Sequence, residues 1–384
     1  MTVYWILLLI AAAGIPICGF TDKKSDKRCT AYCIMACVVL TVVSSIRFSV
    51  GYDYNLYAGF YYDLNFMDMA DISVANREQG FLMLLKLLNT VTEYYGPAFV
   101  LISLLIYPPL AVYIRKNSPC LWLSFVAFLA FGLFFNSMNF MRQFIAAVIC
   151  AFAFCYAEKG SFPRFALTVI LACAFHRSAL LVLPCWCFVF VGWNYLTLAA
   201  ASAGTLFIYL FSENILRFAT QYVYTDYDIS RSKDLLSGLS PFYTVMFGVL
   251  FAAAFLLRNR IKCGERKKNI LIWCSFASFF FELIGTKYAV ISRFGLLFFI
   301  PSVTVLLPEM FISVSESVKS KRVAAVVIGV FMCLNYSALL YNNYNGVLAY
   351  NNPIDLKELK GCIWKIITKE SFIILLFGKI LFCA

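Results

Sequence analysis

Long apolar runs, separated by short polar or basic stretches, recur along the whole chain. A helix that crosses a lipid bilayer needs about 20 mostly apolar residues, so runs of this kind are typical of membrane spans. We expect spans at about 2–19, 30–47, 97–114, 119–135, 143–157, 162–176, 178–192, 195–212, 242–257, 269–285, 294–312 and 323–340. A shorter run at 80–93 contains Lys86, which predicts a helix that lies along the membrane or dips into it without crossing. The pattern therefore predicts an all-α fold, a single polytopic membrane domain over 1–384 with about 10–13 transmembrane helices.

The distribution of basic residues predicts the orientation of these helices. The first apolar run begins at once and a basic stretch, 23–28, follows it, which favours a membrane helix over a cleaved leader. If the N-terminus is extracytoplasmic, more lysines and arginines fall on the cytoplasmic side, as is usual for membrane proteins. Two long extracytoplasmic loops are then expected, at about 47–80 and 213–241. The lysine-rich tail would also lie outside if all twelve spans cross, so its placement is left open.

Composition narrows the function. The chain is 62% hydrophobic and only 14% charged, which is far from the balance of a soluble domain. Its net charge of +12 arises mainly from short loops between apolar runs, so we expect no nucleic-acid partner. Most of the 15 cysteines lie within apolar runs, where cysteine packs as a small hydrophobic residue. With a single histidine and no zinc-type spacing, we expect neither a metal site nor a cofactor.

Candidate chemistry gathers on the predicted outer side. It comprises Arg47 with Asp53, Tyr54 and Tyr57; Glu78 before the short apolar run; Arg142 and Gln143 at the start of a span; His176, Arg177 and Ser178 between two spans; and Arg293 at the start of another. Arginine stays charged and grips phosphate oxygens through a planar fork of donors. Several arginines at one membrane face therefore suit a lipid-linked pyrophosphate, although each could instead reach ordinary lipid phosphate.

The remaining polar groups allow acid–base chemistry or a purely structural role. His176, the only imidazole, could act as a base near pH 7 or simply cap a helix end. Asp53 and Glu78 are the carboxylate candidates, and either could pair with a neighbouring arginine instead. The loop tyrosines suit sugar rings, but tyrosine is also enriched at membrane interfaces whatever the function.

The order of these motifs resembles the EpsG family of Wzy-like polymerases of bacterial exopolysaccharide, capsule or O-antigen. The motifs are Gly-x-Asp-Tyr at 51–54 with a following tyrosine, Glu-x-Gly-Phe at 78–81, Arg-Gln at 142–143 and Phe-His-x-Ser-Ala at 175–179. The similarity covers about 45–310 and is strongest over 136–184. It departs at Tyr52, where a small residue is commoner, and in the lysine-rich tail.

The resemblance implies a glycosyltransferase of the bacterial cytoplasmic membrane that joins polyprenyl-pyrophosphate-linked oligosaccharide repeat units outside the cytoplasm. By the resemblance, the positions of the family's characteristic residues are taken by Asp53, Tyr54, Glu78, Arg142, Gln143, His176, Ser178 and Arg293. Because negative charge grows on the leaving diphosphate in such a reaction, we expect Arg142 and Arg293 to hold it, with Arg177 or Arg47 assisting. We expect Asp53, Glu78 or His176 to orient or deprotonate the acceptor hydroxyl. Beside the lipid bilayer and this substrate, the resemblance leaves room for a flippase and a chain-length regulator as partners. Two alternatives stay open: a transporter or flippase of the same lipid-linked oligosaccharide, and an O-antigen ligase-type transferase.

Overall fold

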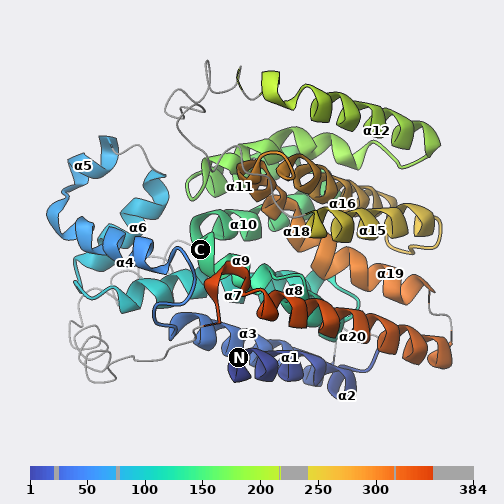
Figure 1. Ribbon diagram of the computed structural model, residues 1–384, viewed down its shortest axis with the longest axis horizontal. Coiled ribbons are helices and arrows are strands. Elements are labelled where there is room, and N and C mark those ends of the chain that lie inside the picture. Colours follow the sequence, from blue (N-terminus) through green and yellow to red (C-terminus); the bar gives the residue numbers. More distant parts are fainter. Residues whose placement is uncertain (21–25, 75–77, 216, 218–240, 315–316, 349–384) are drawn as a thin grey trace.

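The computed structural model describes residues 1–20, 26–74, 78–215, 217, 241–314 and 317–348. Every element of secondary structure in this part of the chain is a helix (Figure 1). The first half contains α1 (Thr2–Ala12), α2 (Gly14–Cys18), α3 (Lys27–Ser45), α4 (Tyr54–Asp63), η1 (Leu64–Phe66), α5 (Met69–Val74), α6 (Gln79–Asn89), α7 (Gly96–Asn117), α8 (Leu121–Ala130), α9 (Leu133–Asn139) and α10 (Met141–Glu158). The second half contains α11 (Phe162–Cys173), η2 (Arg177–Val189), α12 (Tyr195–Leu210), α15 (Phe242–Leu257), α16 (Glu265–Gly285), α17 (Ala289–Ser292), η3 (Arg293–Gly295), α18 (Leu296–Pro301), η4 (Ser302–Leu306), α19 (Leu307–Val314), α20 (Val318–Tyr341) and η5 (Tyr344–Gly346).

All twelve predicted apolar runs coincide with helices or with successive short helices, and the all-α polytopic class is confirmed. Six helices are long and apolar enough to cross a membrane: Lys27–Ser45, Gly96–Asn117, Met141–Glu158, Glu265–Gly285, Ala289–Val314 and Lys319–Tyr341. The pair α8 and α9, bent by 58°, would be a seventh. The other apolar helices are shorter. A 16-residue α-helix rises only about 24 Å, less than the hydrocarbon thickness of about 30 Å. Within the described residues, length and composition thus support six or seven spans, fewer than the 10–13 predicted.

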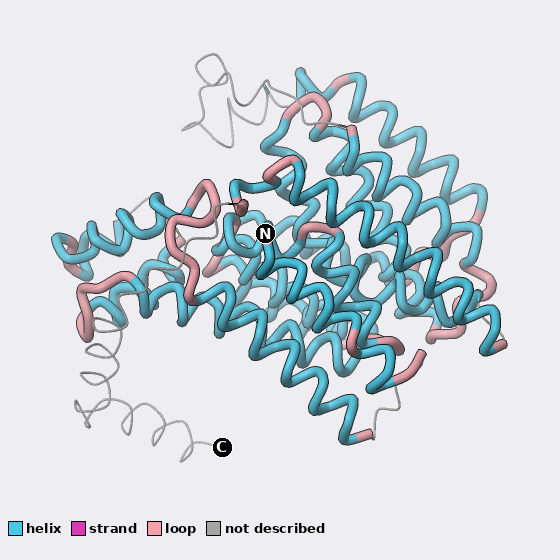
Figure 2. The backbone as a smooth tube through the Cα atoms, turned by 60° about the horizontal axis from the view of Figure 1, so that its bottom comes forward, coloured by secondary structure: helices cyan, strands magenta, loops and turns pink. Residues whose placement is uncertain are grey.

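Helices α4, η1, α5 and α6 form a lobe that projects from one end of the helix bundle (Figures 1 and 2). Helix α6 is the short apolar run of the sequence. Phe81, Leu82 and Leu85 are buried on one face, and Lys86 donates a hydrogen bond of 2.7 Å to the backbone oxygen of Leu64. With 11 residues, α6 is too short to cross the bilayer.

Helix α10 lies in the centre of the bundle, where it packs against α7, α11, η2, α16 and α18. Every residue of α8 is buried, and the chain then bends at Gly132 into α9, which leads directly to the first turn of α10. Gly132 has φ 71°, and a Cβ atom there would lie 2.9 Å from the Tyr243 hydroxyl oxygen. Glycine therefore permits the bend that brings the polar side chains of α9 to the beginning of α10.

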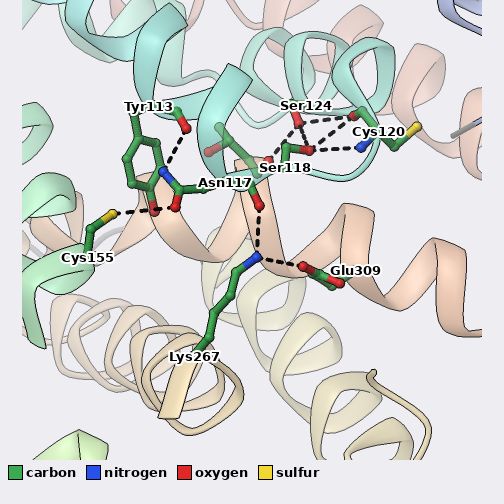
Figure 3. A network of polar contacts seen from close by, with 9 residues as sticks. Tyr113, Asn117, Ser118, Cys120, Ser124, Cys155, Lys267 and Glu309 are labelled. Carbon is green, nitrogen blue, oxygen red and sulfur yellow. Dashed lines mark hydrogen bonds and ion pairs between the residues drawn. The ribbon is translucent and has the colours of Figure 1, made fainter. Parts of the chain in front are cut away.

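The end of the bundle away from the start of α10 is held by a polar network (Figure 3). Lys267, near the start of α16, forms a 2.7 Å ion pair with Glu309 and donates a 2.9 Å hydrogen bond to the Asn117 backbone oxygen. The Ser124 hydroxyl donates to the Thr304 backbone oxygen at 2.6 Å. These contacts tie α7, α8, α16, η4 and α19 together at this end. Most of the predicted loop at 213–241 and the lysine-rich tail lie outside the described residues.

Candidate functional site

Glu78, Arg142 and His176 meet where the lobe joins the bundle. One carboxylate oxygen of Glu78, Oε2, accepts a hydrogen bond from Arg142 Nη1, and Oε1 lies 2.7 Å from His176 Nδ1. Burial alone would raise the pKa of Glu78, but the His176 contact and the Arg142 charge outweigh it and lower the pKa to about 2. Glu78 is therefore ionised, and each of its carboxylate oxygens contacts one basic side chain. The imidazole of His176 lies directly against the Glu78 carboxylate.

A close approach of two backbones brings Glu78 and His176 together. A Cβ atom on Gly80 would lie 2.7 Å from the Ala174 backbone oxygen, and the Phe81 backbone N–H donates to that same oxygen at 3.2 Å. Only glycine allows the start of α6 to lie this close to the end of α11. The Glu-x-Gly-Phe and Phe-His motifs, nearly 100 residues apart, thus form one structural unit.

Gln143, which follows Arg142 in the chain, connects the start of α10 to Arg293. Its side-chain Nε2 donates a 2.6 Å hydrogen bond to the backbone oxygen of Arg293. The Arg293 guanidinium carbon lies 4.9 Å from the centre of the Phe140 ring, in the residue that precedes α10. Arg142 is half-buried and Arg293 is exposed. The first turn of α10, whose N-terminal dipole favours anions, therefore carries Arg142 and lies against Arg293.

Asp53 completes this cationic region. Its backbone N–H donates to Asn139 Oδ1 at 3.3 Å, and Gly51, at φ 97°, lets the loop approach Asn139 so closely that a Cβ atom would lie 3.0 Å from the same oxygen. Burial raises the pKa of the Asp53 carboxyl, while Arg293 and Arg142 oppose this rise. Asp53 therefore lies within electrostatic reach of both arginines and has a higher proton affinity than an ordinary aspartate.

The remaining candidates lie around this centre in different settings. Burial raises the pKa of the Tyr57 hydroxyl, and the adjacent Arg142 counteracts it, so Tyr57 belongs to the same group. Tyr54 is buried and stacks on Phe99 with ring centres 4.5 Å apart. Ser178 is buried, and its hydroxyl makes no hydrogen bond to any described residue. Arg177 is exposed.

Arg47 is placed within the protein rather than at an open surface. Only 3% of the residue is exposed, and its guanidinium donates to the Ser44 backbone oxygen at 2.9 Å, to Ser44 Oγ at 2.8 Å and to the Met138 backbone oxygen at 2.9 Å. These bonds join the end of α3 to α9. Its predicted contact with substrate stays a prediction, and the geometry assigns Arg47 a role in holding α9 in place.

A cavity of about 520 Å³ opens beside Arg293. This volume is in the usual range for small-molecule sites, about 300–1,000 Å³. Aromatic, amide and acidic side chains line it: Asn136, Phe140, Phe242, Tyr243, Glu282, Ser292, Arg293, Phe299, Asn342, Tyr344 and Asn345, with apolar residues between them. Of these, the sequence identified only Arg293 as a site residue. Glu282, a carboxylate within an apolar run, was the one detectable signal, because such residues are costly in membranes and are usually functional.

The described residues contain no group of three or more His, Cys, Asp or Glu side chains arranged to hold a metal ion. Comparison with known proteins gives one match: the model of the EpsG family matches residues 30–352. No curated protein and no solved structure matches the chain.

Proposed function

This chain belongs to the EpsG family of Wzy-like polymerases, and we propose that it joins polyprenyl-pyrophosphate-linked oligosaccharide repeat units at the outer face of the bacterial cytoplasmic membrane. Membership of the family supports an exopolysaccharide or O-antigen polymerase-like role. The observation that carries the finer proposal is the hydrogen bond from Gln143 to the Arg293 backbone, since it brings Arg293 to the first turn of α10 beside Arg142.

The orientation of the site follows from the charges of the bundle. Arg115, Lys116, Lys267 and Lys268 lie at the ends of α7 and α16 that meet in the polar network, away from the start of α10. Basic residues are enriched on the cytoplasmic side of membrane proteins. The network end is then cytoplasmic, and Arg142, Arg293 and the cavity face the outside, where lipid-linked repeat units are available.

In the proposed reaction, a hydroxyl of one repeat unit attacks the anomeric carbon of a second unit. The new C–O bond forms as the bond to the pyrophosphate breaks, and polyprenyl pyrophosphate leaves with the electron pair. Negative charge grows on the leaving group in the transition state. Arg142 and Arg293 therefore stabilise the transition state more than the bound substrate, which is the condition for catalysis.

The two carboxylates receive different roles. Glu78 is a poor base, because its pKa is about 2 and both of its oxygens have partners. It positions Arg142 and His176. Asp53 has a raised pKa and lies near both arginines, so we assign it the removal of the acceptor proton. His176, held beside Glu78, is assigned a hydrogen-bonding role toward the sugar or the diphosphate.

The experiment that tests this function is reconstitution. Purified protein in liposomes is incubated with lipid-linked repeat units isolated from the host, and the products are separated by size. A ladder of products that differ by one repeat unit, with release of polyprenyl pyrophosphate, is expected. Units that only cross the bilayer, or that are moved to another acceptor without growth of a ladder, would contradict it.

A further inference from the structure

Glu282 is a buried acidic residue whose carboxyl group has no partner within the described part of the chain. It lies near the end of α16, is 6% exposed and lines the cavity beside Arg293. Its backbone oxygen accepts a hydrogen bond from the Thr244 hydroxyl at 3.0 Å. No described residue, however, donates a hydrogen bond to the Glu282 carboxyl group or forms an ion pair with it. Arg47 and Glu282 are the only charged side chains buried among the described residues, and Arg47 has several acceptors.

Two other carboxylates with low solvent exposure each have basic partners. The side chain of Glu78 is 9% exposed and has Arg142 and His176, and that of Glu309 is 12% exposed and has Lys267. A buried polar group without a partner costs several kcal/mol in general. An apolar residue at position 282 would avoid this cost. An uncompensated carboxyl group that faces a cavity therefore points to a ligand that supplies the missing hydrogen bonds.

The other walls of the cavity indicate the chemistry of that ligand. Phe140, Tyr243 and Tyr344 present aromatic rings, which suit the apolar face of a sugar ring. Tyr344 and Asn345 both donate to Asn136 Oδ1, at 2.9 and 2.8 Å, and so fix the amide of Asn136 with its N–H donors still available. Rings, an oriented amide and a carboxylate together match a ring that carries hydroxyl groups.

We propose that this cavity binds a sugar residue of a repeat unit, with the Glu282 carboxyl group accepting hydrogen bonds from its hydroxyls. The proposal rests on the proposed function for the identity of the saccharide and extends it to Glu282, which has no role in that function. Because Arg293 lines the same cavity, a sugar bound there lies next to the groups that hold the diphosphate. Glu282 then fixes which sugar enters, while Arg142 and Arg293 act on the leaving group.

The test measures saccharide binding separately from polymerisation. The free oligosaccharide, released by mild acid from the lipid-linked repeat units of the host, is titrated into purified protein in detergent by isothermal calorimetry. Glu282→Gln and Ala338→Phe are compared with wild type. The second variant narrows the cavity from α20 and leaves Glu282 intact, so it tests the site even if the first variant folds poorly. Glu265→Gln, a change at the exposed start of the same helix, is the matched control.

Binding is expected to weaken about ten-fold or more in Glu282→Gln and in Ala338→Phe, and to be unchanged in Glu265→Gln, because a saccharide hydroxyl loses its hydrogen bond to the carboxyl group or the space is filled. Unchanged affinity in a folded Glu282→Gln protein, or in Ala338→Phe, would overturn the proposal. Polymerisation assays with the same variants show whether the cavity holds the sugar of the donor unit or that of the acceptor unit. If the variants raise only the KM for the lipid-linked unit, the cavity holds the sugar of the donor. If free oligosaccharide competes in the assay, the cavity holds the sugar of the acceptor. A wild-type protein that binds the free oligosaccharide but does not polymerise the lipid-linked units would contradict only the proposed function.

Discussion

Replacing Arg142 with lysine separates the charge of this residue from the geometry of its guanidinium group. In the structure, Arg142 donates from Nη1 to Glu78 Oε2 and also has a hydrogen bond with the Tyr57 side chain, and we propose that the remaining N–H donors of its fork hold a phosphate oxygen. Lysine has a single nitrogen at the end of its side chain. A lysine ammonium has three donors, but they all lie on one nitrogen, so it cannot contact Glu78 through one nitrogen and the diphosphate through another as the guanidinium can.

The expected loss of rate in Arg142→Lys is that of one charge-assisted hydrogen bond to the diphosphate. Such a bond contributes about 1.5–3 kcal/mol. Each 1.36 kcal/mol of lost transition-state stabilisation slows a reaction about ten-fold, so Arg142→Lys is expected to lower kcat by about 10- to 150-fold. Since the charge is retained, the KM for the lipid-linked unit should change less than kcat.

The assay is the initial rate of ladder formation in liposomes at equal amounts of protein. Arg217→Lys is the matched control, because Arg217 also pairs with a glutamate, Glu213 at 2.7 Å, but is exposed on the surface. The control should polymerise at the wild-type rate. If Arg142→Lys did so as well, the bidentate contact with the diphosphate would be refuted.

Three further predictions concern the groups around Arg142. Glu78→Gln should slow polymerisation at pH 7 and lower the melting temperature. Because the pKa of Glu78 in the folded protein is lowered to about 2, the difference in stability between wild type and variant should shrink as the pH falls from about 4.5 toward 2. A difference that stays constant with pH would contradict the ion pair. The wild-type rate should fall as the pH drops through a pKa above the ordinary 3.8 of Asp53, and the weak residual activity of Asp53→Asn should lack this acid limb; a retained limb would exclude Asp53 as the base. Arg47→Lys should lower the melting temperature through the lost bonds to Ser44 and Met138 with little change in KM, and a raised KM at unchanged stability would instead support contact with substrate.

The sequence predicted the helices well because their cause is local. Each apolar run is long enough to form a helix by its own composition, and all twelve do. The number that cross was harder to predict, since runs such as 162–176 and 178–192 contain a shorter α-helix and a 3-10 helix, and their length alone does not decide whether they span. The bend of 58° between α8 and α9 depends on the left-handed conformation of Gly132, which an apolar run does not reveal.

The site was predictable where a motif marks it and not where it is assembled by distant packing. The sequence predicted Arg142, Gln143, Glu78 and His176 on one face, and the structure brings Arg142 and His176 into contact with Glu78, while Gln143 binds Arg293. It did not predict that Gln143 binds a backbone oxygen or that both carboxylate oxygens of Glu78 contact protein side chains. The cavity residues of η5, 200 residues beyond α9 in sequence, carry no motif, and only the fold brings them to Asn136.

The central claim is that Arg142 and Arg293 together hold a diphosphate. It is tested most directly by measuring the affinity of purified protein for polyprenyl pyrophosphate and for polyprenyl monophosphate, in wild type and in the variant with both arginines changed to lysine. The account predicts that wild type binds the pyrophosphate at least ten-fold more tightly and that the double variant loses this preference. Equal affinity of wild type for the two lipids, or an unchanged preference in the double variant, would contradict it.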